Sequence, residues 1–329
     1  MGYARLKRRL DAGDIIILDG ATGTELQRRG ARMDSESWSA PVVLEDEKLL
    51  TRIHADYIRA GSDVVTANTF SASRMLLEPA GYGDRVQEII RRSVEAAQNA
   101  RRLAGAERRV AVAGSISHMV PVIPGANQND PARMPSRREI ADSMGEQAEI
   151  LKAAGADFIL LEMMFHPGRS RLAIKAALAS GLPVWLGMSA RRDKGGRLMS
   201  FEESEEIPLR SVLSIVPPAG IDVAGFMHTN VDVTLDAIRA LRKRYKGPLL
   251  AYPDSGYFEM PEWRFNDVIT PARLKQHYLA WLQAGVQAIG GCCGLTVRHI
   301  KAAVAARDAF KKSRPRPPAK KPAAKKRTR

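Results

Sequence analysis

The stretch QAIGGCCGLTVRHI (residues 287–300) joins a short apolar run to two adjacent thiols and then to the start of an amphipathic segment. Cys292 and Cys293 are the only cysteines among 329 residues. An apolar run followed by apolar residues at helical spacing is typical of one β-α unit of a parallel sheet. A disulfide between sequence neighbours is strained and could not brace so long a chain. We therefore expect reduced thiols at the exit of a buried strand, in a cytoplasmic protein.

The same β-α unit recurs along the chain. Eight apolar or β-branched runs each precede a segment in which apolar residues return every three or four positions. The expected strands cover residues 15–18, 63–67, 109–114, 157–162, 183–187, 222–226, 248–252 and 287–291. Eight such units predict an α/β protein with a single (β/α)8 TIM barrel. An open doubly wound sheet is the alternative, but neither a G-x-G-x-x-G nor a P-loop sequence follows any of the runs.

The positive charge of the chain is concentrated at its C-terminal end. The net charge is +15, and within residues 311–329 ten of nineteen residues are Lys or Arg and none is acidic. Pro, Ala and Lys without apolar periodicity cannot bury enough surface to offset the entropy lost on ordering. We expect a barrel over residues 1–310 and a disordered basic tail over residues 311–329. Nucleic acid is expected to bind weakly at most, through the tail. No membrane partner is expected, because no run is long enough to span a bilayer.

Polar residues of unusual type stand at the ends of the predicted strands, where the functional side chains of such barrels gather. They are Asp19, residues 68–70 (NTF), residues 115–117 (SIS), Glu162, His228, residues 253–256 (PDSG) and the pair Cys292 and Cys293. We expect these positions to meet at one mouth of the barrel.

Adjacent thiols between glycines can turn both sulfur atoms toward one point, because glycine adopts backbone geometry that other residues resist. Zinc is the metal ion that we expect such a pair to bind. A catalytic zinc ion takes three protein ligands and leaves a fourth position open. Among the six histidines of the chain, His228 lies at the exit of the sixth predicted strand and is the expected third ligand. Core packing of the thiols and a hydrogen-bonded scaffold role for His228 are the alternatives.

Two carboxylates are candidates for substrate contact. Glu162 ends the apolar run FILLE, where a charged carboxylate requires a cationic or hydrogen-bonding partner. The ammonium group of an amino acid would serve as that partner. Asp19 in DGATG is either a second contact or a turn residue.

Several of these motifs, in this order, resemble those of the homocysteine S-methyltransferase family. The resemblance extends from about residue 14 to about residue 308 and rests on LDGATGTELQRRG (18–30), HADYIRAGSDVVTANTFSAS (54–73), VAGSIS (112–117), Glu162, YPDSG (252–256) and GGCCGLTVRHI (290–300). It implies a (β/α)8 barrel that transfers a methyl group to the sulfur of homocysteine held by zinc. The product would be methionine, which would place the chain in methionine biosynthesis.

The resemblance also implies roles for individual residues. Cys292 and Cys293 would be zinc ligands, and the third family ligand is a cysteine in a G-x-N-C sequence that leaves strand six. Aligned without gaps from Gly220, His228 takes the place of that cysteine. A second alignment on the Asn of that sequence would put Val231 there, but it requires an insertion in the strand. We therefore predict a zinc site formed by His228, Cys292 and Cys293.

The remaining family positions concern the two substrates. Asp19 and Glu162 would recognise the amino group of homocysteine, and the backbone around Thr69 and Phe70 would lie near its carboxylate.

On the donor side, Trp38 matches one ring of the cage that encloses betaine in some relatives, but residues 71 and 163 are Ser and Met where tyrosines would be expected. We expect a sulfonium donor, S-methylmethionine or S-adenosylmethionine, and an acceptor that is homocysteine or a close thiol or selenol analogue. A relative that acts on another small methylated molecule and a non-catalytic barrel whose tail binds polyanions are the alternatives.

Overall fold

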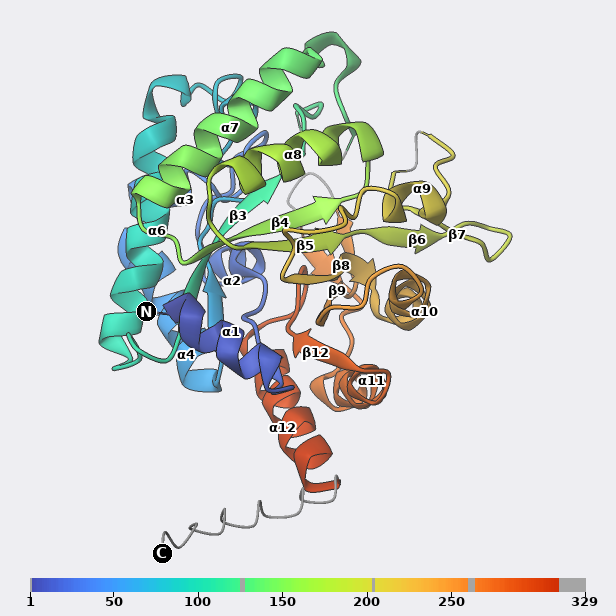
Figure 1. Cartoon of the computed structure of the whole chain (residues 1–329). Helices are drawn as coiled ribbons and strands as arrows, with labels where there is room; N and C mark the ends of the chain where they lie inside the picture. Colours follow the sequence, from blue (N-terminus) through green and yellow to red (C-terminus); the bar gives the residue numbers. More distant parts are fainter. Residues whose placement is uncertain (1, 125–127, 203–204, 260–263, 314–329) are drawn as a thin grey trace, which may run out of the picture.

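Eight parallel strands form the centre of the computed structural model, which describes residues 2–124, 128–202, 205–259 and 264–313. The strands are β1 (Ile16–Ile17), β2 (Val64–Thr66), β3 (Ala111–Ser117), β4 (Phe158–Met164), β5 (Val184–Met188), β8 (Val223–Asn230), β9 (Leu249–Asp254) and β12 (Val286–Ile289). Each overlaps one of the eight predicted runs. Their order in the sheet is β1-β12-β9-β8-β5-β4-β3-β2, and helices surround them (Figure 1). The predicted (β/α)8 barrel is confirmed.

Helices lie around the strands. They are α1 (Gly2–Asp11), α2 (Thr22–Arg28), α3 (Val42–Glu45), α4 (Glu47–Ala60), α5 (Arg74–Leu77), α6 (Val86–Leu103), α7 (Arg137–Ala153), α8 (Pro167–Ala179), α9 (Leu209–Leu213), α10 (Val231–Arg242), α11 (Pro271–Gln283) and α12 (Val297–Ser313). Helix α1 precedes β1, α12 follows β12, and the others are in the connections between strands. Two hairpins interrupt the pattern, β6 (Ala190–Arg192) with β7 (Leu198–Ser200) and β10 (Tyr257–Glu259) with β11 (Arg264–Asn266). The first lies in the connection after β5, which also contains the short helix α9.

Helix α1 closes the end of the barrel opposite to the site described below. Leu6 and Leu10 of α1 are buried in the same apolar cluster as Phe158 and Trp185 of the strands. The ring of Tyr3 lies 5.3 Å from the ring of Phe158, centroid to centroid. Figure 1 shows α1 lying across the strands at this end. The apolar positions of this short helix thus extend the core of the barrel.

The two ends of the sheet meet at a seam between β1 and β2, which is joined by side chains as well as by backbone. The Asp63 amide donates to the Ile17 carbonyl at 2.6 Å. The Asp63 carboxylate accepts a hydrogen bond from the Ile17 amide at 3.0 Å. Arg9 of α1 donates to the same carboxylate at 2.6 Å. Helix α1 is therefore bound to the seam that it covers.

The last described helix extends beyond the predicted limit of the barrel. Helix α12 ends at Ser313, so residues 311–313, which the sequence predicts to be part of the tail, are helical. The Lys311 ammonium lies 2.6 Å from an Asp14 carboxylate oxygen. Residues 314–329 of the predicted tail lie outside the described residues.

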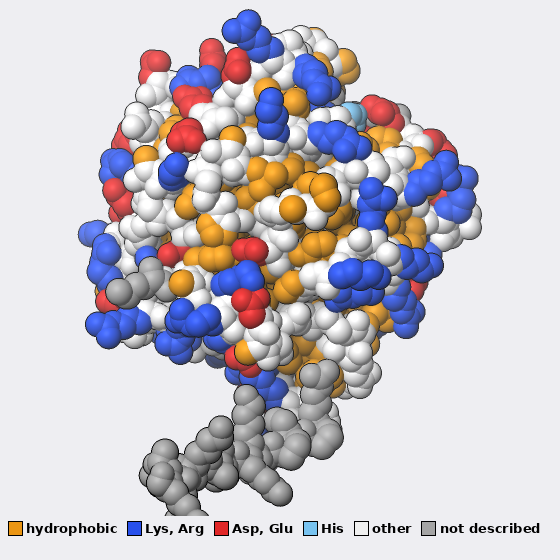
Figure 2. All heavy atoms as spheres, viewed as in Figure 1, with side chains coloured by type: hydrophobic (Ala, Val, Ile, Leu, Met, Phe, Trp, Pro, Cys, Tyr) orange, Lys and Arg blue, Asp and Glu red, His pale blue; other side chains and the backbone are white. Residues whose placement is uncertain are grey.

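The surface carries mixed charge. On the face of the molecule that Figure 2 shows, Lys and Arg side chains are scattered among Asp and Glu, and apolar side chains lie across the middle. Within the described part of the chain, every helix is too short or too polar to cross a lipid bilayer.

Candidate active site

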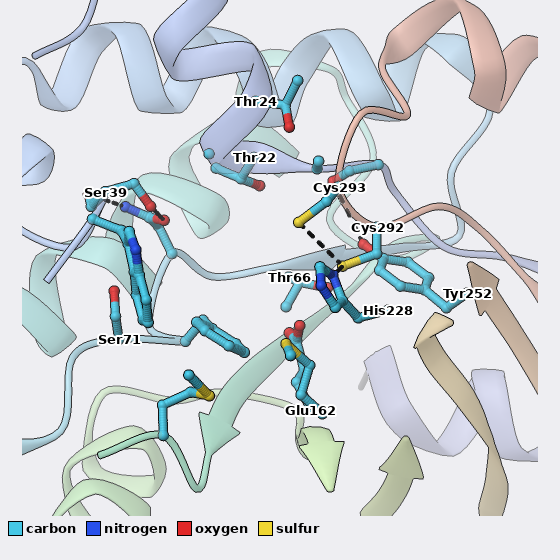
Figure 3. A pocket seen from close by; sticks show the side chains of 18 of the residues that line it. Thr22, Thr24, Ser39, Thr66, Ser71, Glu162, His228, Tyr252, Cys292 and Cys293 are labelled. Atoms are coloured by element: carbon cyan, nitrogen blue, oxygen red, sulfur yellow. Dashed lines mark hydrogen bonds between the residues drawn. The ribbon is translucent and has the colours of Figure 1, made fainter. Parts of the chain in front are cut away.

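A cavity of about 190 Å³ opens at the carboxyl ends of the strands. Its wall includes the ends of β4, β8 and β9 and the loops after β1, β2 and β12. Figure 3 shows Cys292, Cys293 and His228 grouped together in this wall, with Glu162 beside them. Six of the strand-end residues singled out from the sequence line the cavity: Asn68, Phe70, Glu162, His228, Cys292 and Cys293. Asp19, Thr69, residues 115–117 and residues 253–256 are not among the lining residues.

Three side chains in the wall could hold a metal ion. One ligand atom each from His228, Cys292 and Cys293 all lie within 4.8 Å of one another. The two sulfur atoms are 3.8 Å apart, and the Cys292 sulfur is 3.5 Å from Nδ1 of His228. Tetrahedral zinc, with bonds of about 2.3 Å to sulfur and about 2.0 Å to nitrogen, gives edges of about 3.8 Å and about 3.5 Å. These two edges match, and the third, from the Cys293 sulfur to the imidazole, lies within 4.8 Å. The donor set of two thiols and one imidazole nitrogen is the kind that zinc prefers, so the residues present fit zinc. Val231 is the first residue of α10, and its side chain offers no ligand atom.

The position of His228 depends on an irregularity in its strand. The pairing of β8 with β9 shifts register between Met227 and Asn230. Within this irregular stretch His228 has a φ of 42°, in the left-handed region that residues with a Cβ seldom adopt. Such irregularities at strand ends re-aim side chains and store strain that the surrounding structure must hold in place. Here the irregularity accompanies the placement of the imidazole in the cavity wall.

The loop that carries the two cysteines is bound to its neighbours by backbone hydrogen bonds. The Cys292 amide donates to the Pro253 carbonyl at 2.7 Å, and the Cys293 carbonyl accepts from the Ser255 amide at 3.1 Å. Gly294 has a φ of 78°, which glycine adopts without strain. A Cβ on Gly290 would lie 2.7 Å from the ring of Tyr252. The glycines around the thiols thus allow both the turn and the close approach of β9.

Burial and neighbouring charges shift the proton affinities of these ligands. The contact with Cys293, followed by burial, raises the pKa of Cys292 well above its usual value. Burial opposes a positive charge on His228, but Asp254 and Cys292 outweigh it and raise the pKa of the imidazole to about 9. Without a metal ion, raised pKa values favour the protonated forms of Cys292 and His228, and metal binding must displace those protons.

The two predicted carboxylates differ in their access to the cavity. Glu162 lines it, with 8 % of the residue exposed, and burial raises its pKa to about 7. Asp19 is fully buried, and burial raises its pKa to about 7 as well. The carboxylate of Asp19 accepts hydrogen bonds from the amide and hydroxyl of Thr66, at 2.6 and 3.1 Å, and from the hydroxyl of Tyr252 at 3.1 Å. Glu162 is in the wall, whereas Asp19 lies behind Thr66 and Tyr252, both of which line the cavity.

The other predicted substrate contacts also differ in whether they line the cavity. Phe70 lines the cavity, and its ring lies 5.9 Å from the ring of Trp38. Thr69 is fully buried, and its hydroxyl donates to the Ser115 carbonyl at 2.9 Å. Ser71 and Met163, the positions at which the betaine cage departs from its pattern, are also in the wall.

Phe201 belongs to the wall but was not predicted from the sequence. Its ring meets the ring of His228 edge-on, with centroids 5.0 Å apart. Phe201 follows the hairpin formed by β6 and β7 and therefore lies outside the simple strand-end pattern. No sequence signal marks it.

Comparison with known proteins identifies the family. The family described as homocysteine S-methyltransferase matches residues 16–307. The chain belongs to this family. It is 30 % identical to the homocysteine S-methyltransferase of Escherichia coli strain K12 over 313 residues, which are 90 % of this chain and 96 % of that protein. It is 25 % identical to the selenocysteine Se-methyltransferase of Brassica oleracea var. italica, over 89 % of this chain and 88 % of that protein.

A solved structure agrees with this homocysteine S-methyltransferase assignment. The metallated form of the homocysteine methyltransferase MmuM from Escherichia coli superposes with a TM-score of 0.72 and 26 % identity, covering 91 % of this chain and 99 % of that one. The chain is therefore an enzyme of the homocysteine S-methyltransferase family, and its His228, Cys292 and Cys293 cluster could hold a metal ion.

Proposed function

We propose that this protein catalyses zinc-dependent methyl transfer to the thiol of homocysteine or of a close thiol or selenol analogue. The observation that carries the proposal is the cluster of one imidazole and two thiols, whose ligand atoms lie within 4.8 Å of one another in the cavity wall. Family membership supports the acceptor, and the selenocysteine methyltransferase among the relatives supports a selenol as an alternative acceptor. Both observations favour an enzyme over a non-catalytic barrel.

Zinc suits this ligand set because it prefers sulfur and nitrogen ligands. His228, Cys292 and Cys293 would hold the ion, and its charge would lower the pKa of a coordinated substrate thiol, so that the proton is released to solvent and a nucleophilic sulfur remains. The cysteines carry no disulfide, which suits reducing conditions such as those of the cytoplasm. Methylation of homocysteine yields methionine, so the activity would serve methionine biosynthesis.

Glu162 is the proposed contact for the ammonium group of the acceptor. Its carboxylate lines the cavity beside the cluster of His228, Cys292 and Cys293. A bound ammonium would stabilise the ionised form of the carboxylate, which burial disfavours. Asp19 would contribute from behind, because its oxygens hold the Thr66 hydroxyl and the Tyr252 hydroxyl in place. A direct contact from Asp19 to substrate would require the exchange of one of these partners. The backbone near Thr69 and Phe70 would face the substrate carboxylate.

The proposed methyl donor is a sulfonium, either S-methylmethionine or S-adenosylmethionine. Its positive charge can rest against the faces of Trp38 and Phe70, which lie side by side in the wall. In the transfer, the acceptor sulfur forms a bond to the methyl carbon while the bond between that carbon and the donor sulfur breaks. The electron pair of the broken bond remains on the donor sulfur, which becomes a neutral thioether.

The test combines metal content with product analysis. Purified parent protein, Cys292→Ser and Cys293→Ser are assayed for zinc by elemental analysis and for methionine by mass spectrometry, with homocysteine as acceptor. S-methylmethionine, S-adenosylmethionine and betaine are offered separately. We expect one zinc ion per parent chain, methionine from a sulfonium donor, and loss of both in each variant. Full activity in a zinc-free parent, or a zinc content unchanged in both variants, would overturn the proposal.

A further inference from the structure

Asp254 is an acidic residue at the end of β9, beside the cluster of His228, Cys292 and Cys293. The proposed function gives it no role. Its carboxylate oxygen Oδ2 lies 3.8 Å from Nε2 of His228. The other oxygen, Oδ1, is buried and has no hydrogen-bond partner among the residues that the structure describes. The backbone of Asp254 pairs with Asn230 of β8, two residues after His228. A buried carboxylate oxygen without a partner is costly, so this placement calls for an explanation.

The orientation of the imidazole supplies that explanation. Nδ1 of His228 faces the Cys292 sulfur at 3.5 Å, so a metal ion in the cluster would bind through Nδ1. A neutral imidazole that binds a metal through one nitrogen carries its proton on the other. That proton on Nε2 needs an acceptor, and the Asp254 carboxylate is the group beside it.

We propose that Asp254 is a positioning residue, which accepts the Nε2 proton of His228 and so fixes the ring and the tautomer that place Nδ1 toward the metal. This inference rests on the proposed zinc site. A hydrogen bond requires the present 3.8 Å to shorten, by about 0.9 Å. Phe201 meets the ring edge-on, so the imidazole has an aromatic contact as well as the carboxylate.

The same contact has an electrostatic consequence. Two thiolates and one neutral imidazole leave a zinc ion with no net charge. A carboxylate that accepts the imidazole proton brings one negative charge close to the ligand and increases the electron density that Nδ1 can donate. Asp254 would therefore strengthen metal binding without touching the metal.

The first arm of the experiment measures zinc affinity by competition with a chromophoric chelator. We expect Asp254→Ala to weaken zinc binding about 10- to 100-fold, and Asp254→Asn to lie between Ala and the parent because its carbonyl still accepts a hydrogen bond. The absorption bands of the cobalt-substituted protein should shift in the Ala variant. Asp232→Ala is the matched control, since Asp232 lies at the same 3.8 Å from His277 but is 79 % exposed. Equal zinc affinities of the parent and Asp254→Ala would overturn the proposal.

The second arm separates positioning from support of the fold. In a His228→Cys background no imidazole proton exists, so Asp254→Ala should no longer weaken zinc binding. A loss of the same size in both backgrounds would show that Asp254 only supports the ends of β8 and β9, and would overturn its positioning role. Failure of the underlying zinc site would look different. The parent would then bind zinc no more tightly than Cys292→Ser, and both inferences would fall.

Discussion

Replacement of Glu162 by Gln tests the substrate-binding half of the site without removing a metal ligand. The change keeps the shape of the side chain but removes the charge that would meet the substrate ammonium. A hydrogen bond to a charged group contributes about 1.5–3 kcal/mol, which corresponds to a dissociation constant about 10- to 150-fold higher for homocysteine. Zinc content should be unchanged, because Glu162 lies outside the cluster of His228, Cys292 and Cys293.

The pKa of Glu162 adds a pH dependence to this prediction. With a pKa of about 7, raised by burial, the carboxylate is ionised above pH 7 and neutral below it. Homocysteine affinity of the parent should therefore fall as pH drops through 7, up to about tenfold per unit. The Gln variant should not show this part of the dependence.

The free energy of unfolding should depend on pH in the opposite sense to the homocysteine affinity. A carboxyl group with a raised folded-state pKa contributes stability below its unfolded pKa, near 4.5, that is lost as pH rises through 7. The amide of the Glu162→Gln variant would stay neutral throughout. The variant should therefore match the parent near pH 4.5 and exceed it at pH 8, by a free energy of unfolding on the order of 3 kcal/mol.

Titration calorimetry of zinc-loaded protein with homocysteine at pH 6, 7 and 8 measures the affinity, and thermal melts measure the stability. Glu149→Gln, on the exposed face of α7, is the matched control for a change from Glu to Gln. The reasoning is refuted if the Glu162→Gln variant binds homocysteine within about twofold of the parent at pH 8. Loss of zinc from that variant would equally refute the assigned role.

Three further predictions concern the metal site, the C-terminal end and the core. His228→Ala should weaken zinc binding by more than about 100-fold while His228→Cys retains zinc; an Ala variant that binds zinc like the parent in chelator competition excludes His228 as a ligand. Deletion of residues 314–329 should leave turnover and melting temperature unchanged, whereas deletion from Lys311 also removes its contact with Asp14 and costs up to about 1 kcal/mol; a large loss of turnover in the shorter deletion contradicts this. Gly225→Ala should destabilise the barrel by about 3 kcal/mol or more, because the new Cβ would lie 1.9 Å from the Leu250 carbonyl; a denaturation midpoint close to that of the parent would refute it.

The strands and the cysteine pair could be predicted because their signals are local. Apolar runs such as residues 157–162 and the helical spacing that follows each run are readable in short windows, and the barrel follows from their number. The role of α1 could not be predicted in this way. Whether its few apolar residues are exposed or buried depends on Phe158 and Trp185, which lie far away in the sequence.

The site could be predicted by residue type and strand end, but its arrangement could not. Asp19 follows β1 and Glu162 lies near the end of β4, yet only Glu162 lines the cavity. The carboxylate of Asp19 is instead hydrogen-bonded to Thr66 and Tyr252. The contact between Asp254 and His228 depends on the register of β8 against β9 and on the irregularity after Met227. Register is a long-range property that spacing along one strand does not contain.

The order of strands in the sheet has a consequence for synthesis on the ribosome. Ile16 of β1 pairs with Ala288 of β12, so the first strand to be translated finds this partner only after the last one emerges. At roughly 5–20 residues per second, that interval is about a quarter of a minute to one minute. Throughout it the apolar run at residues 15–18 lacks this neighbour and is open to wrong partners. Closure of the barrel between β1 and β12 is therefore a late event, which follows the synthesis of β12.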